Sequence, residues 1–185
     1  MSFVFDYMKA IQAVSVLLRC AGRTATDNYL RVLKLLYIAE REALKETGFF
    51  ITGDRISAMK NGPVLSHVYD LIMNRDPHNE TWNRFVEREN YNICLIDDPG
   101  KGKLSRYEVK KLQEVWERYR LTDEWELVQE THGYLEWQRN NPGESSKRIP
   151  LEDILEAVGR SADRELIEQR ARNSAAFKAS FGTQA

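Results

Sequence analysis

Apolar residues recur at steps of three and four along most of the chain, which is the spacing of amphipathic helices. A first helix is predicted over residues 3–19. Its apolar positions are Val4, Met8, Ile11, Val14 and Leu18. Thr24 and Thr26 are candidate N-caps for a second helix from about Asp27. Gly48 is placed to end that second helix as a left-handed C-terminal cap.

The pattern changes after Gly48, where apolar residues stand in short runs separated by turn formers. Residues 49–51 and 56–59 are predicted as two extended pieces around a turn, as in a small hairpin. Pro63 suits the first position of the helix that follows. The apolar positions of that helix are Val64, Val68, Leu71 and Ile72.

Residues 91–96 are predicted as a further strand, with a short partner strand at residues 103–104 across a cluster of turn formers. Ser105 then opens a helix, and Glu108 three residues later completes a capping box. Thr122 is the candidate cap of the next helix. The apolar positions of that helix are Trp125, Val128 and Leu135.

A loop rich in turn formers at residues 140–146 is the candidate domain boundary. It divides the chain into a domain of residues 1–145 and a helical C-terminal extension of residues 146–185. The extension is predicted to hold a short helix from Pro150 and a final helix over residues 163–180. Because isolated helices are marginal in water, we expect the extension to pack on its own domain, on a second copy or on a partner.

These elements together predict a mainly α fold of the α+β class. It is a compact helical domain with one or two small antiparallel β-hairpins and a helical C-terminal extension. The chain has 185 residues, of which 42% are apolar, and this is enough to build one packed core. Cys20 and Cys94 stand among apolar neighbours and are predicted as buried, reduced thiols.

Charge and hydropathy exclude several classes of function. The formal net charge of −1 gives no electrostatic footprint for nucleic acid, which needs a clustered excess of lysine and arginine. The apolar runs are far too short for a membrane span, and the first residues do not form a signal peptide. We therefore expect a cytoplasmic protein that does not act on a membrane, and the balanced charge argues against a nucleic-acid partner.

Residue spacings typical of catalysis are missing from the sequence. The run from Gly100 to Lys103 lacks the spacing of a phosphate-binding loop and is interpreted as a turn. His67, His78 and His132 have no partner at zinc-ligand spacing, and no Gly-x-Ser-x-Gly elbow is present. We therefore expect no enzyme activity, no cofactor and no metal.

Three stretches together resemble a known family. They are residues 34–41 (KLLYIAER), 51–64 (ITGDRISAMKNGPV) and 131–137 (THGYLEW). In order and rough spacing they are similar to the segments of the Panacea domain, also called the SocA-like antitoxin domain. The resemblance covers about residues 5–140 and leaves out the C-terminal tail.

The resemblance implies an antitoxin of a bacterial or prophage toxin–antitoxin pair, which neutralises a cognate toxin protein by covering it. It also directs attention to side chains that could contact the partner. The candidate contact residues within the resemblance are Asp54, Met59, Asn61, His67, His132 and Trp137. Leu166 and Phe177 are added because the C-terminal extension is expected to contact a partner. A structural role competes with contact, because Gly53, Gly62 and Pro63 are residue types that shape turns and helix starts.

Other functions stay open alongside this one. The same fold would suit an adaptor that delivers a bound protein to a protease, and partner lifetime in cells separates that role from stoichiometric neutralisation. A DNA-binding regulator would need a helix-turn-helix, for which the surroundings of Gly159 are the candidate. An enzyme with an unrecognised site would depend on groups such as Asp54 or His132. A homo-oligomer is compatible with each of these functions.

Overall fold

The computed structural model describes residues 3–181, without the side chains of 177–181. Its helices are α1 (Tyr7–Cys20), α2 (Tyr29–Thr47), α3 (Ser66–Ile72), α4 (Asn79–Trp82), α5 (Arg106–Arg118), α6 (Glu124–His132), α7 (Leu135–Arg139), α8 (Leu151–Ala157), the 3-10 turn η1 (Ser161–Asp163) and α9 (Arg164–Phe181). Its strands are β1 (Thr26–Asn28), β2 (Ile56–Met59), β3 (Gly62–Leu65), β4 (Val86–Glu89), β5 (Asn92–Leu95) and β6 (Ser146–Arg148). The predicted mainly helical α+β class is confirmed.

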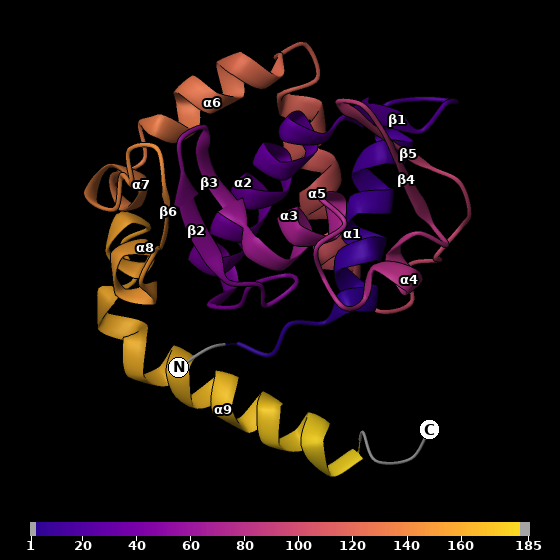
Figure 1. Ribbon diagram of the computed structural model, residues 1–185. Helices are drawn as coiled ribbons and strands as arrows, with labels where there is room; N and C mark the ends of the chain where they lie inside the picture. Colours follow the sequence, from indigo (N-terminus) through magenta and orange to yellow (C-terminus); the bar gives the residue numbers. More distant parts are fainter. Residues whose placement is uncertain (1–2, 182–185) are drawn as a thin grey trace.

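Helix α2 lies in the middle of the molecule, with the β2–β3 hairpin in front of it and α6 above (Figure 1). The Asn28 side chain caps its start by accepting from the backbone N–H of Leu30 at 2.9 Å. Gly48 ends it with a φ of 79°, as predicted. Residues 31–40 of this helix are all buried, so elements pack against it on every side.

The first helix begins four residues later than predicted. Asp6 caps α1 by accepting from the backbone N–H of Lys9 at 3.0 Å, which fixes the start at Tyr7. Val4 lies before this cap and is 43% exposed, so its assignment to the apolar face was wrong. A capping side chain decides where a helix starts, whereas apolar spacing extends beyond it.

The hairpin after α2 is formed by residues 56–59 and 62–65, whereas residues 49–51 and 56–59 were predicted. Strands β2 and β3 pair antiparallel, with Ile56 opposite Leu65 and Met59 opposite Gly62. Residues 49–51 form no strand. Pro63 belongs to β3 rather than to a helix, and β3 is an edge strand of the sheet ordered β3-β2-β6. A proline fits an edge strand because the missing N–H leaves no partner unsatisfied there.

The second sheet has the order β1-β5-β4. The predicted strand at residues 91–96 is confirmed as β5, but the partner predicted at residues 103–104 was wrong. The partners are β4, joined through a tight turn, and β1, which precedes α2. Residues 103–104 instead lead into α5, and the backbone N–H of Lys103 donates to the Gln12 side chain at 2.8 Å.

The capping box of α5 is confirmed, with Ser105 and Glu108 satisfying each other's backbone N–H groups. The next helix, α6, is capped by Asp123 rather than Thr122, in a second capping box with Glu126. Leu135 was wrongly placed on this helix. It belongs to α7 and is 53% exposed.

The C-terminal extension contributes to the same core as the rest of the chain. Strand β6 pairs with β2, and Ile154, Leu155 and Ile167 are buried in the main hydrophobic cluster. The division at residue 145 stays a prediction. Cys20 and Cys94 are free, as expected, but half-buried rather than buried. Within residues 3–181, no helix has both the length and the apolar character to cross a bilayer.

A pair of glycine variants tests how tightly the hairpin is held. At Gly62, with φ of 90°, an added Cβ would lie 2.7 Å from Thr131 Oγ1 and 3.0 Å from Lys34 Nζ. Gly62→Ala should therefore lower the free energy of unfolding by about 2–4 kcal/mol. Gly100 has φ of 67° and open space around it, so Gly100→Ala should cost only about 1 kcal/mol. Urea unfolding measures both, and equal losses would contradict a packed hairpin.

Candidate functional site

Buried polar side chains of α2 hold the β2–β3 hairpin and its entry segment through hydrogen bonds to the backbone. Lys34 is completely buried, and its ammonium donates to the carbonyl of Pro63 at 2.8 Å. Burial lowers the pKa of Lys34 from 10.5 to about 7, because no carboxylate among the described residues pairs with it. One turn and a half later, Glu40 is also buried.

Glu40 fixes the segment that leads into the hairpin. It accepts from the backbone N–H of Thr52 at 2.8 Å, from the Thr52 hydroxyl and from the backbone N–H of Ile51. Burial raises the pKa of Glu40 to about 7, and these hydrogen bonds oppose the rise. The N–H groups of Ile51 and Thr52 therefore bond to a side chain rather than to a neighbouring strand, which keeps this segment a loop.

Asp54 links the start of the hairpin to the helix after it. Its carboxylate accepts from the backbone N–H groups of His67 at 3.1 Å and Val68 at 3.0 Å, in the first turn of α3. It also accepts from the N–H of Arg55 at 2.6 Å. Burial raises the pKa of Asp54 to about 6, against the effect of these donors. Asp54 thus positions two elements and presents no free oxygen to a partner.

His132 and Trp137 hold the other end of the hairpin. Nε2 of His132 donates to the carbonyl of Lys60 at 3.1 Å, and Nε1 of Trp137 donates to the carbonyl of Met59 at 3.0 Å. The two rings stack, with centroids 3.9 Å apart. Helices α6 and α7, which are distant in sequence from the hairpin, therefore fix the turn between β2 and β3.

A further buried carboxylate joins α7 to α2, and the sequence analysis did not identify it. Glu136 is fully buried, accepting from the Tyr37 hydroxyl at 2.6 Å and from Nε of Arg41 at 2.7 Å. Tyr37 and Glu136 both stand inside the stretches that carry the family resemblance, which was the available signal. Burial and the Glu136 carboxylate raise the pKa of Tyr37.

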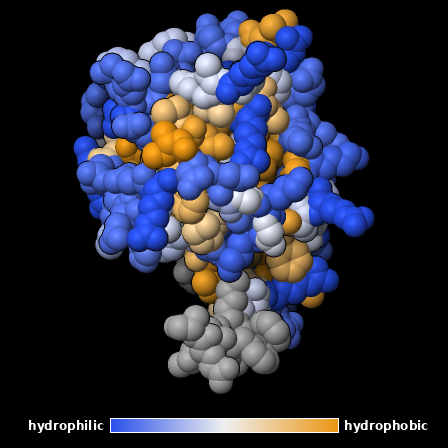
Figure 2. Space-filling view, turned by 90° about the vertical axis from the view of Figure 1, so that its right-hand side faces the viewer, coloured by the Kyte–Doolittle hydropathy of each residue, from blue (hydrophilic) through white to orange (hydrophobic). Residues whose placement is uncertain are grey.

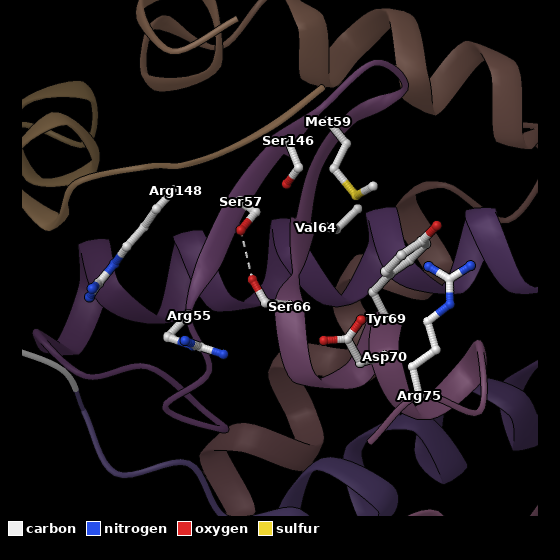
Figure 3. Close-up of a pocket in the computed structure, with 10 residues that line it drawn as sticks. All are labelled: Arg55, Ser57, Met59, Val64, Ser66, Tyr69, Asp70, Arg75, Ser146 and Arg148. Atoms are coloured by element: carbon white, nitrogen blue, oxygen red, sulfur yellow. Dashed lines mark hydrogen bonds between the residues drawn. The ribbon is translucent and has the colours of Figure 1, made fainter. Parts of the chain in front are cut away.

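The outward face of the β3-β2-β6 sheet forms the wall of a groove of about 360 Å³ (Figure 3). It is lined by Arg55, Ser57, Met59, Val64, Ser66, Tyr69, Asp70, Arg75, Ser146 and Arg148. Figure 3 shows the hydroxyl of Ser57 in β2 hydrogen-bonded to that of Ser66, the first residue of α3, at 2.8 Å. Tyr69, Asp70 and Arg75 close the opposite side of the groove, from α3 and the loop after it.

The groove carries a positive charge and side-chain types that are common at protein interfaces. Three arginines line it against a single aspartate, so its potential is positive. Among the described residues, Arg55 and Arg75 take part in no ion pair. Met59 and Tyr69 add an adaptable apolar side chain and an aromatic ring, which are enriched at the centres of interfaces.

Six of the eight predicted contact residues lie in or around the hairpin. Met59 lines the groove, and Asn61 is exposed at the hairpin turn. Asp54, His132 and Trp137 hold the hairpin. His67 stacks on Phe5 with centroids 4.7 Å apart and donates from Nδ1 to Asp76 at 3.1 Å.

The remaining two candidates lie on α9, at the far side of the molecule from the hairpin turn in Figure 1. Leu166 is 45% exposed, while its neighbour Ile167 is buried in the core. The side chain of Phe177 lies outside the described part of the structure. These two positions are therefore not brought together with the other six.

Figure 2 shows the face that carries the β1-β5-β4 sheet, with an apolar area in its middle among hydrophilic side chains. A hollow of about 450 Å³ lies beside β4. Leu71, Trp82 and Val86 line it but are at most 1% exposed, so they belong to the core rather than to a free surface. Among the described residues, no group of three His, Cys, Asp or Glu side chains is placed to hold a metal ion.

The buried ammonium of Lys34 makes a pH-dependent prediction. Since its folded pKa of about 7 lies below 10.5, the unfolded chain binds more protons between these values, and stability rises with pH across that range. Through this group, the free energy of unfolding should increase by roughly 3 kcal/mol from pH 7 to pH 9.5. Lys34→Met should abolish this increase and stabilise the protein at pH 7.

Lys45 provides the control for this measurement, because it is exposed on the same helix. Lys45→Met should keep the increase between pH 7 and pH 9.5 in urea unfolding. An unchanged pH profile in Lys34→Met would show that the ammonium is hydrated or paired in the folded protein.

The comparisons with known proteins agree with this geometry. The chain matches the family described as antitoxin SocA-like, Panacea domain, over residues 32–138. That range begins within α2 and ends within α7, so it contains every side chain described above that holds the hairpin. No curated protein and no solved structure matches the chain significantly. The chain belongs to the SocA-like antitoxin family defined by the Panacea domain.

Proposed function

We propose that this chain is the antitoxin of a toxin–antitoxin pair in the bacterial cytoplasm and that it neutralises its cognate toxin by direct binding. Membership of the antitoxin family supports a role in such a pair. The groove on the β3-β2-β6 sheet is the proposed contact surface. The C-terminal extension is proposed as a second contributor to the interface, through the exposed side of α9 near Leu166.

The observation that carries the proposal is the alternation within residues 54–59. Asp54, Ile56 and Ala58 are at most 4% exposed, whereas the residues between them line the groove. Successive side chains of a strand point to opposite faces, so one short segment both anchors the hairpin and supplies its outer surface. A family segment with this double role supports recognition through the outer face.

A hairpin held in this way is preorganised for binding. Its turn, its entry segment and the helix after it are each fixed by a buried side chain: Trp137, Glu40 and Asp54. Binding then orders few groups on this side of the interface, and this reduces the entropic cost of association. In the proposed mechanism, Met59 and Asn61 contact the toxin, and Asp54, His67, His132 and Trp137 act by positioning.

Co-expression tests the function directly. Each gene adjacent to this one is induced in a bacterial host, with and without this chain, while growth is followed. We expect one neighbour to arrest growth alone, this chain to restore growth, and the two proteins to co-purify. Arg75→Glu should weaken the rescue, because it reverses a charge in the groove without touching a buried contact.

Arg23 gives the matched control, since it is an exposed arginine that does not line the groove. Arg23→Glu should rescue growth as well as the unchanged chain does. Harmless neighbours, or rescue without a complex, would contradict neutralisation by binding. Rescue accompanied by a shortened lifetime of the bound protein would instead identify an adaptor for proteolysis.

A further inference from the structure

A second pocket lies at the tips of the two hairpins, where they meet the starts of α2 and α6. Its volume is about 370 Å³. It is lined by Asn28, Tyr29, Leu30, Asn61, Tyr91, Glu124 and Trp125. These residues come from four segments: the start of α2, the β2–β3 turn, the β4–β5 turn and the start of α6. The groove described above has a different lining.

Aromatic rings dominate this pocket and are open to solvent. Trp125 is 57% exposed and Tyr91 is 70% exposed, although large apolar side chains are usually covered in a folded domain. The Tyr91 ring lies nearly parallel to that of Tyr29, with centroids 6.4 Å apart and planes 13° from parallel. The Trp125 backbone is fixed, because its N–H donates to the capping carboxylate of Asp123 at 2.8 Å.

The charge of the lining is negative. Glu124 is its only ionisable carboxylate, and neither lysine nor arginine is among the lining residues. One Glu124 oxygen accepts from the Asn28 amide at 3.0 Å, which fixes the carboxylate beside the rings. Asp123 and Glu126 form the capping box of α6 and so offset the positive end of that helix. The Asn61 amide adds a neutral polar group.

A carboxylate beside exposed aromatic faces is the chemistry that attracts an organic cation. The same protein already uses such contacts internally. The guanidinium of Arg88 lies 5.0 Å from the Tyr29 ring centroid, and that of Arg41 lies 4.3 Å from the centroid of Tyr134. Exposed tryptophan and tyrosine side chains are also the residue types most enriched among interface hot spots.

We propose that this pocket binds an arginine side chain presented by a protein partner, with the guanidinium against Trp125 and Tyr91 and paired with Glu124. The inference does not depend on the partner being a toxin. An arginine is favoured over a lysine because its planar cation can stack on a ring and pair with a carboxylate at the same time. The partner therefore presents an exposed arginine to the hairpin tips.

The probe is the peptide acetyl-Gly-Arg-Gly-amide, titrated into the full-length chain while tryptophan fluorescence is recorded. Trp82 and Trp137 are buried, and Trp116 is only partly exposed and does not line the pocket, so the exposed Trp125 should give the main response. We expect a saturable change. The neutral citrulline peptide of the same shape should bind about threefold to tenfold more weakly. Equal binding of both peptides, or no saturable change, would overturn the proposal.

Two charge-neutralising variants distinguish the local effect of the pocket carboxylate from the general electrostatic effect of charge on α6. Glu124→Gln keeps an acceptor for Asn28 but removes the carboxylate, and should weaken arginine-peptide binding at least about threefold. Glu126→Gln changes the charge by the same amount two residues away, keeps the capping box and lies outside the lining, so it should bind normally. Equal effects of the two variants would overturn the proposal, as would self-association that occupies the pocket with a second copy.

Discussion

Polar side chains of α2 are buried against the segment that follows it, and their hydrogen bonds determine where that segment lies. A buried amine or carboxylate costs free energy unless it finds donors or acceptors, so each such group restricts the backbone around it. Lys34 finds the carbonyl of Pro63, and Glu40 finds the N–H groups before the hairpin. The rest of the fold is arranged so that α6 and α7 close over the resulting hairpin.

This arrangement gives the buried charged residues a role in the fold. Replacing a buried charge network by apolar residues is often neutral or stabilising, so such networks are better understood as fixing one geometry than as adding stability. Here the fixed element is a hairpin whose outer face forms a positively charged groove. Buried side chains of the family segments therefore fix the hairpin, and the outward residues between them form the groove that we propose as the contact surface.

Local sequence signals were sufficient to predict helix ends that are stabilised by neighbouring residues. The capping box at Ser105 and Glu108 and the glycine cap at Gly48 depend on residues within one turn, and both are found as predicted. The pairing of β5 with β1 and β4 was not predictable in this way. Strand β1 has three residues, and its partner β5 lies more than 60 residues away, so no local pattern marks it.

The candidate site was predicted in outline only. Residues 51–64 were identified through the resemblance, yet the sequence did not separate the anchoring side chains from the outward ones. The reason is that α2 is buried on every side, so helical periodicity could not tell that Lys34 points inward. The groove itself combines residues from β2, α3 and β6, which only the folded chain brings together.

The most direct test separates the buried side chains that fix the hairpin from the outward side chains that line the groove. Calorimetry measures the affinity of two variants for the partner that co-expression identifies. Arg75→Glu alters the groove, and Thr131→Val removes a buried hydrogen bond beneath the hairpin, from Thr131 Oγ1 to the Val128 carbonyl at 3.0 Å. The account predicts weaker binding with unchanged unfolding free energy for the first variant. For the second it predicts lower unfolding free energy with unchanged affinity. The opposite pattern would show that the buried motif, and not the groove, determines recognition.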